Sequence, residues 1–136
     1  MKVLVIDGQG GGIGRQLVSA VKGNFPNAEI IAVGTNSAAT AAMLKAGADA
    51  AATGENSVVV CARSADIIIG PVGIVIADAL LGEITPAMAV AVGQSRAKRI
   101  LIPVNHCDNV IVGVGDLAMG KLMQDVIAEI GKELQS

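Results

Sequence analysis

The chain of 136 residues contains no tryptophan and no tyrosine, and its single phenylalanine is Phe25. Without aromatic side chains the protein lacks the stacking platforms on which single-stranded nucleic acids bind. Basic residues are not in excess either, because the formal net charge is −2, so no nucleic-acid partner is expected. The core must be built from aliphatic residues, which is typical of parallel sheets covered by helices on both faces.

Cysteine and histidine are also scarce. The two cysteines, Cys61 and Cys107, come without a secretion signal, which predicts reduced thiols and a cytoplasmic protein. One histidine and two distant cysteines are a poor metal-binding set, so no metal site is predicted. Asp78 and Glu83 interrupt the longest apolar stretch, 67–92, which favours a buried or subunit-facing segment over a membrane span.

Apolar strands alternate with helical segments along the chain. We predict strands at 2–6, 29–33, 49–52, 66–69 and 99–104, and helices at 13–24, 38–46, 54–64 and 86–97 and from 116 onward. Strands separated by helices imply βαβ units with right-handed crossovers. The prediction is therefore a single α/β domain, 1–136, with a doubly wound, mostly parallel sheet in a Rossmann-like three-layer sandwich. Periodicity does not decide between helix and strand for 74–81, and 110–114 is expected to pair as an antiparallel edge strand.

A glycine-rich run, Asp7-Gly8-Gln9-Gly10-Gly11-Gly12-Ile13-Gly14, connects the first strand to the first helix. Glycine has no Cβ atom, so the backbone amides of this loop can come close to a ligand. The helix N-terminus that follows offers unpaired N–H groups and a partial positive charge, which suits a phosphate group. All eight residues are therefore predicted to bind a nucleotide or another small phosphorylated molecule. The alternative is a tight packing turn that Asp7 stiffens by accepting amide hydrogen bonds.

The spacing Gly8-x-x-x-Gly12-Ile13-Gly14 resembles the cofactor loop of the short-chain dehydrogenase/reductase family. The resemblance implies that these glycines shape the turn under a pyrophosphate, with Ile13 beside it. It does not extend to that family's reaction, because the Tyr-x-x-x-Lys arrangement has no counterpart in a chain without tyrosine. As a whole, the chain resembles a family of short bacterial proteins of unknown function marked by Asp-Gly-Gln-Gly-Gly-Gly-Ile-Gly, which implies a Rossmann-like fold.

The end of the second predicted strand bears on the identity of the nucleotide. NAD-specific sites place Asp or Glu there, whereas this chain has Gly34-Thr35-Asn36-Ser37. Small hydroxyl and amide side chains suit a 2′-phosphate, so NAD or NADP is predicted, with a slight preference for NADP. Capping of the second helix by Asn36 or Ser37 is the alternative explanation. The loop Gly70-Pro71-Val72-Gly73 follows a buried strand and is predicted to border the same ligand.

A polar turn after the last predicted strand carries the catalytic candidates. His106 is the only histidine, and it would act as a general acid or base that Asp108 or Asn105 orients. Cys107 beside it is a candidate nucleophile. An incidental polar turn is the alternative interpretation.

The sequence thus predicts a nucleotide-binding protein, possessing a redox-related role if it is an enzyme. One alternative is a non-enzymatic ligand-sensing or scaffold module. Another is a small transferase or hydrolase that uses His106, Cys107 and Asp108 on a phosphorylated substrate. The apolar residues of 74–81 and 87–92 exceed the need of one small sandwich, so a homo-oligomer is expected.

Overall fold

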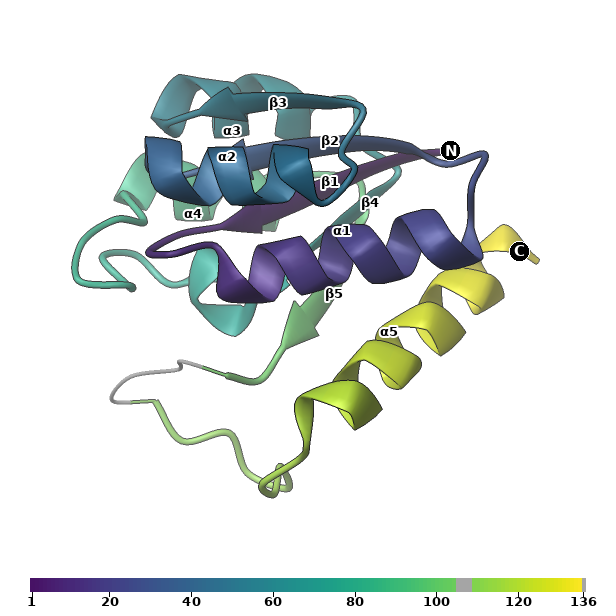
Figure 1. Cartoon of the computed structure of the whole chain (residues 1–136). Coiled ribbons are helices and arrows are strands. Elements are labelled where there is room, and N and C mark those ends of the chain that lie inside the picture. Colours follow the sequence, from purple (N-terminus) through teal and green to yellow (C-terminus); the bar gives the residue numbers. More distant parts are fainter. Residues whose placement is uncertain (105–108, 136) are drawn as a thin grey trace.

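The computed structural model describes residues 1–104 and 109–135. Its five strands form one parallel sheet in the order β3-β2-β1-β4-β5, with helices on both faces (Figure 1). The elements along the chain are β1 (Lys2–Asp7), α1 (Gly12–Asn24), β2 (Glu29–Gly34), α2 (Ser37–Lys45), β3 (Ala50–Thr53), α3 (Glu55–Ala62), β4 (Ile67–Pro71), the 3-10 helix η1 (Val72–Val75), α4 (Pro86–Gln94), β5 (Lys98–Ile102) and α5 (Met119–Leu134). The predicted doubly wound three-layer fold is confirmed.

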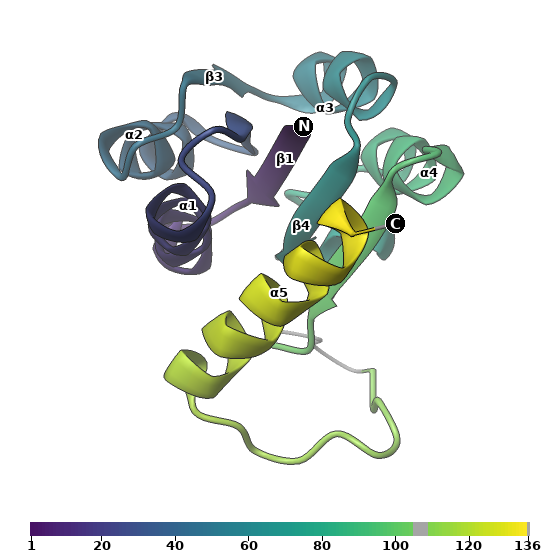
Figure 2. The same ribbon diagram turned by 90° about the vertical axis from the view of Figure 1, so that its right-hand side faces the viewer.

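The central strand β1 is apolar on both faces because helices cover both. Successive side chains of a strand point to opposite faces of the sheet. Val3 and Val5 accordingly pack in a core cluster with residues of α1, α2 and α5, whereas Leu4 and Ile6 pack in a second cluster with residues of α3 and α4. Figure 2 shows α1 and α2 on one side of the sheet and α3 and α4 on the other. This burial on both faces explains why β1 and β4 are continuous apolar runs.

The strand order reverses beside β1. The chain runs from β1 outward to β2 and β3, and then returns to the other side of β1 to form β4 and β5. Ligands of open α/β sheets bind beyond the carboxyl ends of the strands at such a switch point. Figure 1 shows these ends on the left, where the loop after β1 (purple) lies with the segment between η1 and α4 (teal).

The segment after β4 differs from its predicted form. Gly70 and Pro71 belong to β4, and Val72 begins η1, so 70–73 is not an open loop. A Cβ atom at Gly70 would lie 2.5 Å from the carbonyl oxygen of Ile6, so glycine is needed here for β4 to pack beside β1. The following residues, 76–85, form turns rather than the helix or strand that periodicity left open. Much of this apolar stretch fills the core.

The predicted antiparallel edge strand at 110–114 is wrong. These residues adopt no strand, and all strand pairs among the described residues are parallel. Gly113 has a φ of 85°, which interrupts an extended backbone at the middle of the valine-rich run. Val110 and Val112 are 86% and 93% exposed, so the alternating apolar pattern here does not reflect a half-buried strand.

The last helix returns across the sheet. Leu122, Val126 and Ile130 recur every four residues and are buried, so α5 packs one apolar face against the core, and it begins at Met119 rather than at the predicted 116. Within residues 1–104 and 109–135, no helix combines the length and the apolar character that a membrane crossing requires.

Candidate functional site

The side chain of Asp7 organises the glycine-rich loop from beneath. It is 4% exposed, and its Oδ1 accepts a hydrogen bond from the Gly8 N–H at 2.8 Å. Its Oδ2 accepts one from the Gly14 N–H at 2.6 Å. Gly14 is the third residue of α1, whose own N-cap residue, Gly11, has no side chain to cap the helix. Asp7 therefore serves as a remote cap and holds the loop in shape. A contact between Asp7 and a ligand stays a prediction.

The environment of Asp7 perturbs its titration. Burial raises the pKa of this carboxyl, the amides of Gly14 and Gly8 oppose the rise, and the negative charge of Glu83 adds to it. Asp7 therefore binds a proton more tightly than an exposed carboxyl group does.

Three glycines of the loop are required by the fold itself. A Cβ atom at Gly8 would lie 2.7 Å from the Thr35 Oγ1 atom. Gly11 has a φ of 74°, and a Cβ atom there would lie 2.8 Å from the backbone of Ala39. At Gly14 a Cβ atom would lie 2.6 Å from a sulfur atom of α2 and 2.8 Å from the Cβ atom of Asp7. We call Gly8, Gly11 and Gly14 the inner glycines.

Gly10 and Gly12, the outer glycines, have no such internal reason. A Cβ atom at either position would meet nothing within 4 Å, and neither residue has a positive φ. Their N–H groups donate no hydrogen bond to any described residue. Gly12 is the first residue of α1, so its amide belongs to the positive end of the helix dipole. The outer glycines thus present two unused donors to open space.

The end of β2 lies against the same loop. Asn36 caps α2, because its Oδ1 atom accepts from the Ala39 N–H at 2.9 Å, and this confirms the capping interpretation for Asn36. Its Nδ2 atom donates to the Gln9 carbonyl at 2.9 Å, which ties the β2 end to the glycine-rich loop. Ser37 is the exposed first residue of α2, and Gly34 ends β2.

Glu83 joins these two loops, although it is far away in the sequence. Its Oε1 atom accepts hydrogen bonds from the Gln9 N–H at 2.9 Å, the Thr35 hydroxyl at 2.5 Å and the Asn36 amide at 2.8 Å. The Thr35 hydroxyl is the largest cause of a lowered pKa for Glu83, followed by the Gln9 N–H, so the group is ionised at neutral pH. A carboxylate therefore lies where the sequence placed only neutral side chains.

An unusual backbone brings Glu83 to this position. Asp78, Leu80 and Leu81 have φ values of 66°, 56° and 57°, in the left-handed region that non-glycine residues rarely adopt. Each such residue costs on the order of 1 kcal/mol, and it persists only where its surroundings hold it. Buried Leu80 provides that anchorage, since it lies against Gly8, where a Cβ atom would be 3.0 Å from its side chain.

Sequence reasoning missed Glu83 as a site residue. No motif marks it, and its three partners follow β1 and β2, about fifty to seventy positions earlier in the chain, as parallel topology allows. The available signal was that Glu83 is one of only two acidic residues in a long apolar stretch, where a carboxylate is rarely tolerated without partners.

The structure does not bring the remaining predicted site residues into contact with the glycine-rich loop or the end of β2 by any hydrogen bond among the described residues. Gly70, Pro71 and Gly73 are buried in β4 and η1, and contacts between 70–73 and a ligand stay predictions. His106, Cys107 and Asp108 lie outside the described residues, so the catalytic hypothesis also stays a prediction.

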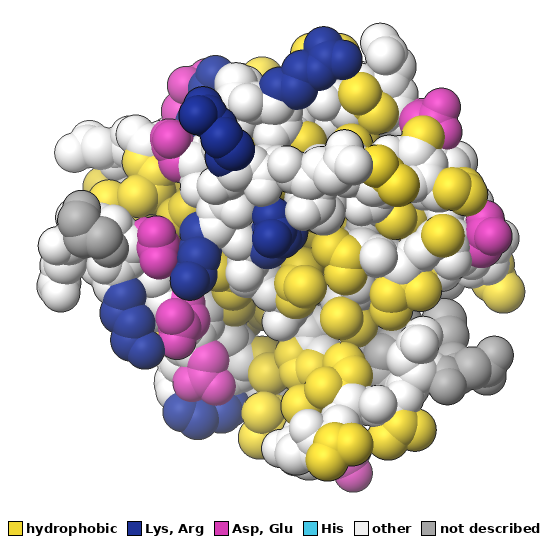
Figure 3. Space-filling view, turned by 180° about the vertical axis from the view of Figure 1, so that it is seen from behind, with side chains coloured by type: hydrophobic (Ala, Val, Ile, Leu, Met, Phe, Trp, Pro, Cys, Tyr) yellow, Lys and Arg dark blue, Asp and Glu magenta, His cyan; other side chains and the backbone are white. Residues whose placement is uncertain are grey.

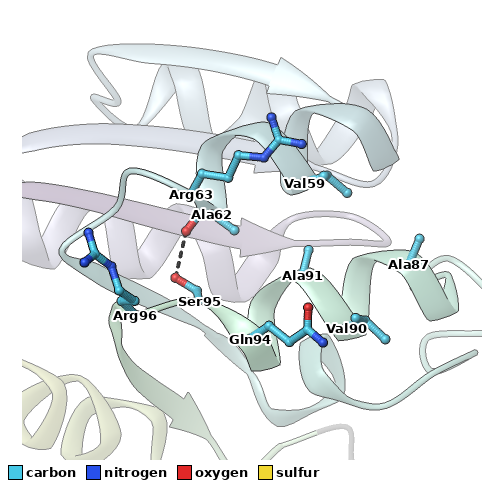
Figure 4. Close-up of a pocket in the computed structure, with 9 residues that line it drawn as sticks. All are labelled: Val59, Ala62, Arg63, Ala87, Val90, Ala91, Gln94, Ser95 and Arg96. Atoms are coloured by element: carbon cyan, nitrogen blue, oxygen red, sulfur yellow. Dashed lines mark hydrogen bonds between the residues drawn. The ribbon is translucent and has the colours of Figure 1, made fainter.

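A groove of about 520 Å³ lies elsewhere, between α3 and α4. Its lining is mostly apolar, and Ser95 closes one end by donating to the Ala62 carbonyl at 2.7 Å (Figure 4). On the face shown in Figure 3, hydrophobic side chains gather in the middle and on the right, whereas most basic and acidic side chains lie on the left and at the top. The groove contains no residue of the glycine-rich loop and no acidic group, so it offers no chemistry related to the site above.

A family model described as "Domain of unknown function (DUF3842)" matches residues 2–135, and the chain therefore belongs to this family. No curated protein matches the sequence. Among solved structures, the chain is similar to a dodecameric FMN-dependent Ubix-like decarboxylase from Escherichia coli O157:H7. The match has 17% identity and a TM-score of 0.44, and it covers 98% of this chain and 76% of the other.

Proposed function

We propose that this protein binds a nucleotide whose phosphate lies on the outer glycines. The observation that carries the proposal is the combination found at Gly10 and Gly12: no Cβ atom, open space and two unused N–H donors at the start of α1. Amides of this kind at a helix N-terminus bind phosphate groups. The site also lies at the switch point of the sheet, where such folds hold ligands.

Open space alone would not distinguish these two glycines. Gly23, Gly93 and others also have nothing within 4 Å of a Cβ atom. The outer glycines combine that space with unused amides beyond the carboxyl end of a central strand, whereas Gly23 and Gly93 lie within or near the ends of helices. A packing turn accounts for the inner glycines but leaves Gly10 and Gly12 unexplained.

NAD or NADP is the ligand class that we propose. The loop is continuous with the end of β2 through the hydrogen bond from Asn36 to Gln9. In dinucleotide-binding folds the pyrophosphate lies on the first of these segments and the adenosine ribose on the second. A redox reaction is the corresponding activity, with His106 as the acid–base candidate, and a nucleotide-sensing module without turnover is the alternative. Loss of turnover on His106→Ala with retained binding would favour the enzyme over the sensor.

Native mass spectrometry of freshly purified protein tests this function first. NAD, NADP, FMN, ATP and CoA are then titrated into the wild type and into Gly12→Val, whose side chain would cover the amides. Gly23→Val is the matched control, because Gly23 lies in the same helix with equally open surroundings. Saturable binding that Gly12→Val abolishes and Gly23→Val preserves is expected. Equal binding by all three proteins, or by none, would contradict the proposal.

We also propose that the chain forms a homo-oligomer. The specific observation is the segment 109–118, where Val110, Val112 and Leu117 are 86%, 93% and 50% exposed. Contiguous exposed apolar side chains are typical of surfaces that another subunit covers. Sedimentation at micromolar concentration tests this, and a monomer throughout would contradict it.

A further inference from the structure

We propose that Glu83 recognises the ribose of the bound nucleotide and selects ligands with a free 2′-hydroxyl over ligands with a 2′-phosphate. The inference rests on the proposed function and names the ligand class more narrowly. It reverses the preference for NADP that the neutral residues at the end of β2 suggest by themselves.

The position of Glu83 suits contact with a bound ribose. Glu83 lies in contact with both segments that a dinucleotide would span, through the Gln9 N–H after β1 and through Thr35 and Asn36 after β2. A carboxylate that recognises ribose hydroxyls normally comes from the end of the second strand itself. Here the end of β2 has no acidic residue, and the segment before α4 supplies one at the same place.

One carboxylate oxygen of Glu83 has unused acceptor capacity. All three hydrogen bonds to Glu83 end on Oε1. Oε2 accepts none from any residue that the structure describes, and the side chain is only partly buried. An ionised carboxylate oxygen accepts strong hydrogen bonds from hydroxyl groups. Oε2 is therefore free to accept a hydrogen bond from a ribose hydroxyl while Oε1 holds the two loops together.

The negative charge of Glu83 distinguishes between the two ligands. Within the described residues Glu83 forms no ion pair, and Thr35 and Asn36 already donate to it. A 2′-phosphate at this place would meet an uncompensated carboxylate, and like charges at contact disfavour binding. A ribose diol meets the same carboxylate as a donor of hydrogen bonds. The same group thus favours one ligand and disfavours the other.

Glu83→Gln separates this role from a merely structural one. Glutamine keeps an acceptor for Gln9 and Thr35 but removes the charge. The affinities of NAD and NADP are measured by calorimetry on each variant. The readout is the ratio of the two affinities, because a general loosening of the loops would weaken both ligands and leave the ratio unchanged. Glu55→Gln is the matched control, because Glu55 also accepts from a threonine, the Thr85 hydroxyl, at 2.5 Å but contacts neither loop.

The wild type is expected to prefer NAD, and Glu83→Gln should reduce that preference by roughly ten- to hundredfold, the range for one charged hydrogen bond. Glu55→Gln should leave it unchanged. A wild type that prefers NADP, or a ratio that Glu83→Gln does not move, would overturn the role of Glu83 while leaving nucleotide binding intact. Absence of binding by every nucleotide in the panel would overturn the proposed function as well.

Discussion

Two loops at the carboxyl ends of the strands are built in opposite ways. In the loop between β1 and α1, the buried Asp7 carboxylate uses both oxygens, and a Cβ atom at any inner glycine would lie within 3 Å of a neighbouring atom. In the segment 109–118, several large apolar side chains are exposed and no regular element forms. The first is complete within one chain apart from the outer glycines, whereas the second exposes surface that a partner would cover. From this contrast we expect a small ligand at the first loop and another subunit at the second.

Removing the centre of the first loop should have the largest effect. Asp7→Ala leaves the buried N–H groups of Gly8 and Gly14 without their acceptor, which should lower the free energy of unfolding by about 2–4 kcal/mol. Chemical denaturation measures the change. Asp49→Ala is a control, because Asp49 also accepts a backbone amide hydrogen bond, from Ile30, but its side chain is 41% exposed. A smaller loss for Asp7 than for Asp49 would contradict the account.

The inner and outer glycines should differ under the same substitution. Gly14→Ala forces a methyl group to within 2.8 Å of the Asp7 Cβ atom, and overpacking of this kind lowers stability by about 1–3 kcal/mol. Gly12→Ala meets open space and should change stability by less than about 1 kcal/mol in either direction. Thermal unfolding of the two variants compares them directly. Equal losses would mean that the distinction between inner and outer glycines has no energetic content.

The pH dependence of stability should carry the signature of Asp7. Burial raises its pKa above the ordinary value of 3.8, so the folded protein binds this proton more tightly than the unfolded chain does. Stability therefore falls as the pH rises from 3.8 through the folded pKa, and the loss is complete above it. Asp7→Asn removes this dependence, so the stability of the variant relative to wild type should increase over that interval. The opposite slope, measured by denaturation at several pH values, would show that the amides lower the pKa instead.

The smallest effect on stability is expected in the second region. Val110→Ser and Val112→Ser change side chains that are 86% and 93% exposed, so the free energy of unfolding of the subunit should change by less than about 0.5 kcal/mol. The same variants should weaken self-association in sedimentation experiments. A large loss of subunit stability without a change in association would place these valines in a core instead of an interface.

Much of the fold follows from local sequence signals. Strand and helix boundaries from β1 through α4 agree with the predictions within a few residues, because alternation of apolar runs and capping residues such as Asn36 and Thr85 act locally. The conformations of 74–81 and 110–114 could not be predicted from local signals. Most apolar residues of 74–81 pack in the core without a regular spacing, and those of 110–114 are largely exposed. In both, positive φ values at Leu80, Leu81 and Gly113 break any regular element.

Only part of the candidate site could be predicted from the sequence. Glycine-rich loops carry a local signature, and the alternative interpretation of Asp7, that it accepts amide hydrogen bonds and stiffens the turn, is confirmed. The division of the glycines into inner and outer was not predictable, because it depends on α2 and on the segment before α4 packing against the loop. Glu83 could not be predicted for the same reason, because the order of the strands brings its hydrogen-bond donors Gln9 and Thr35 to it.

Backbone amide shifts during a nucleotide titration test the central claim most directly. In a ¹⁵N-labelled sample, we predict that added NAD produces the largest saturable shifts at the Gly10 and Gly12 amides, whose N–H groups are unused in the structure. The amides of Gly8 and Gly14, which Asp7 holds, should shift less. Shifts centred on the groove between α3 and α4, with the outer glycines unmoved, would contradict the account.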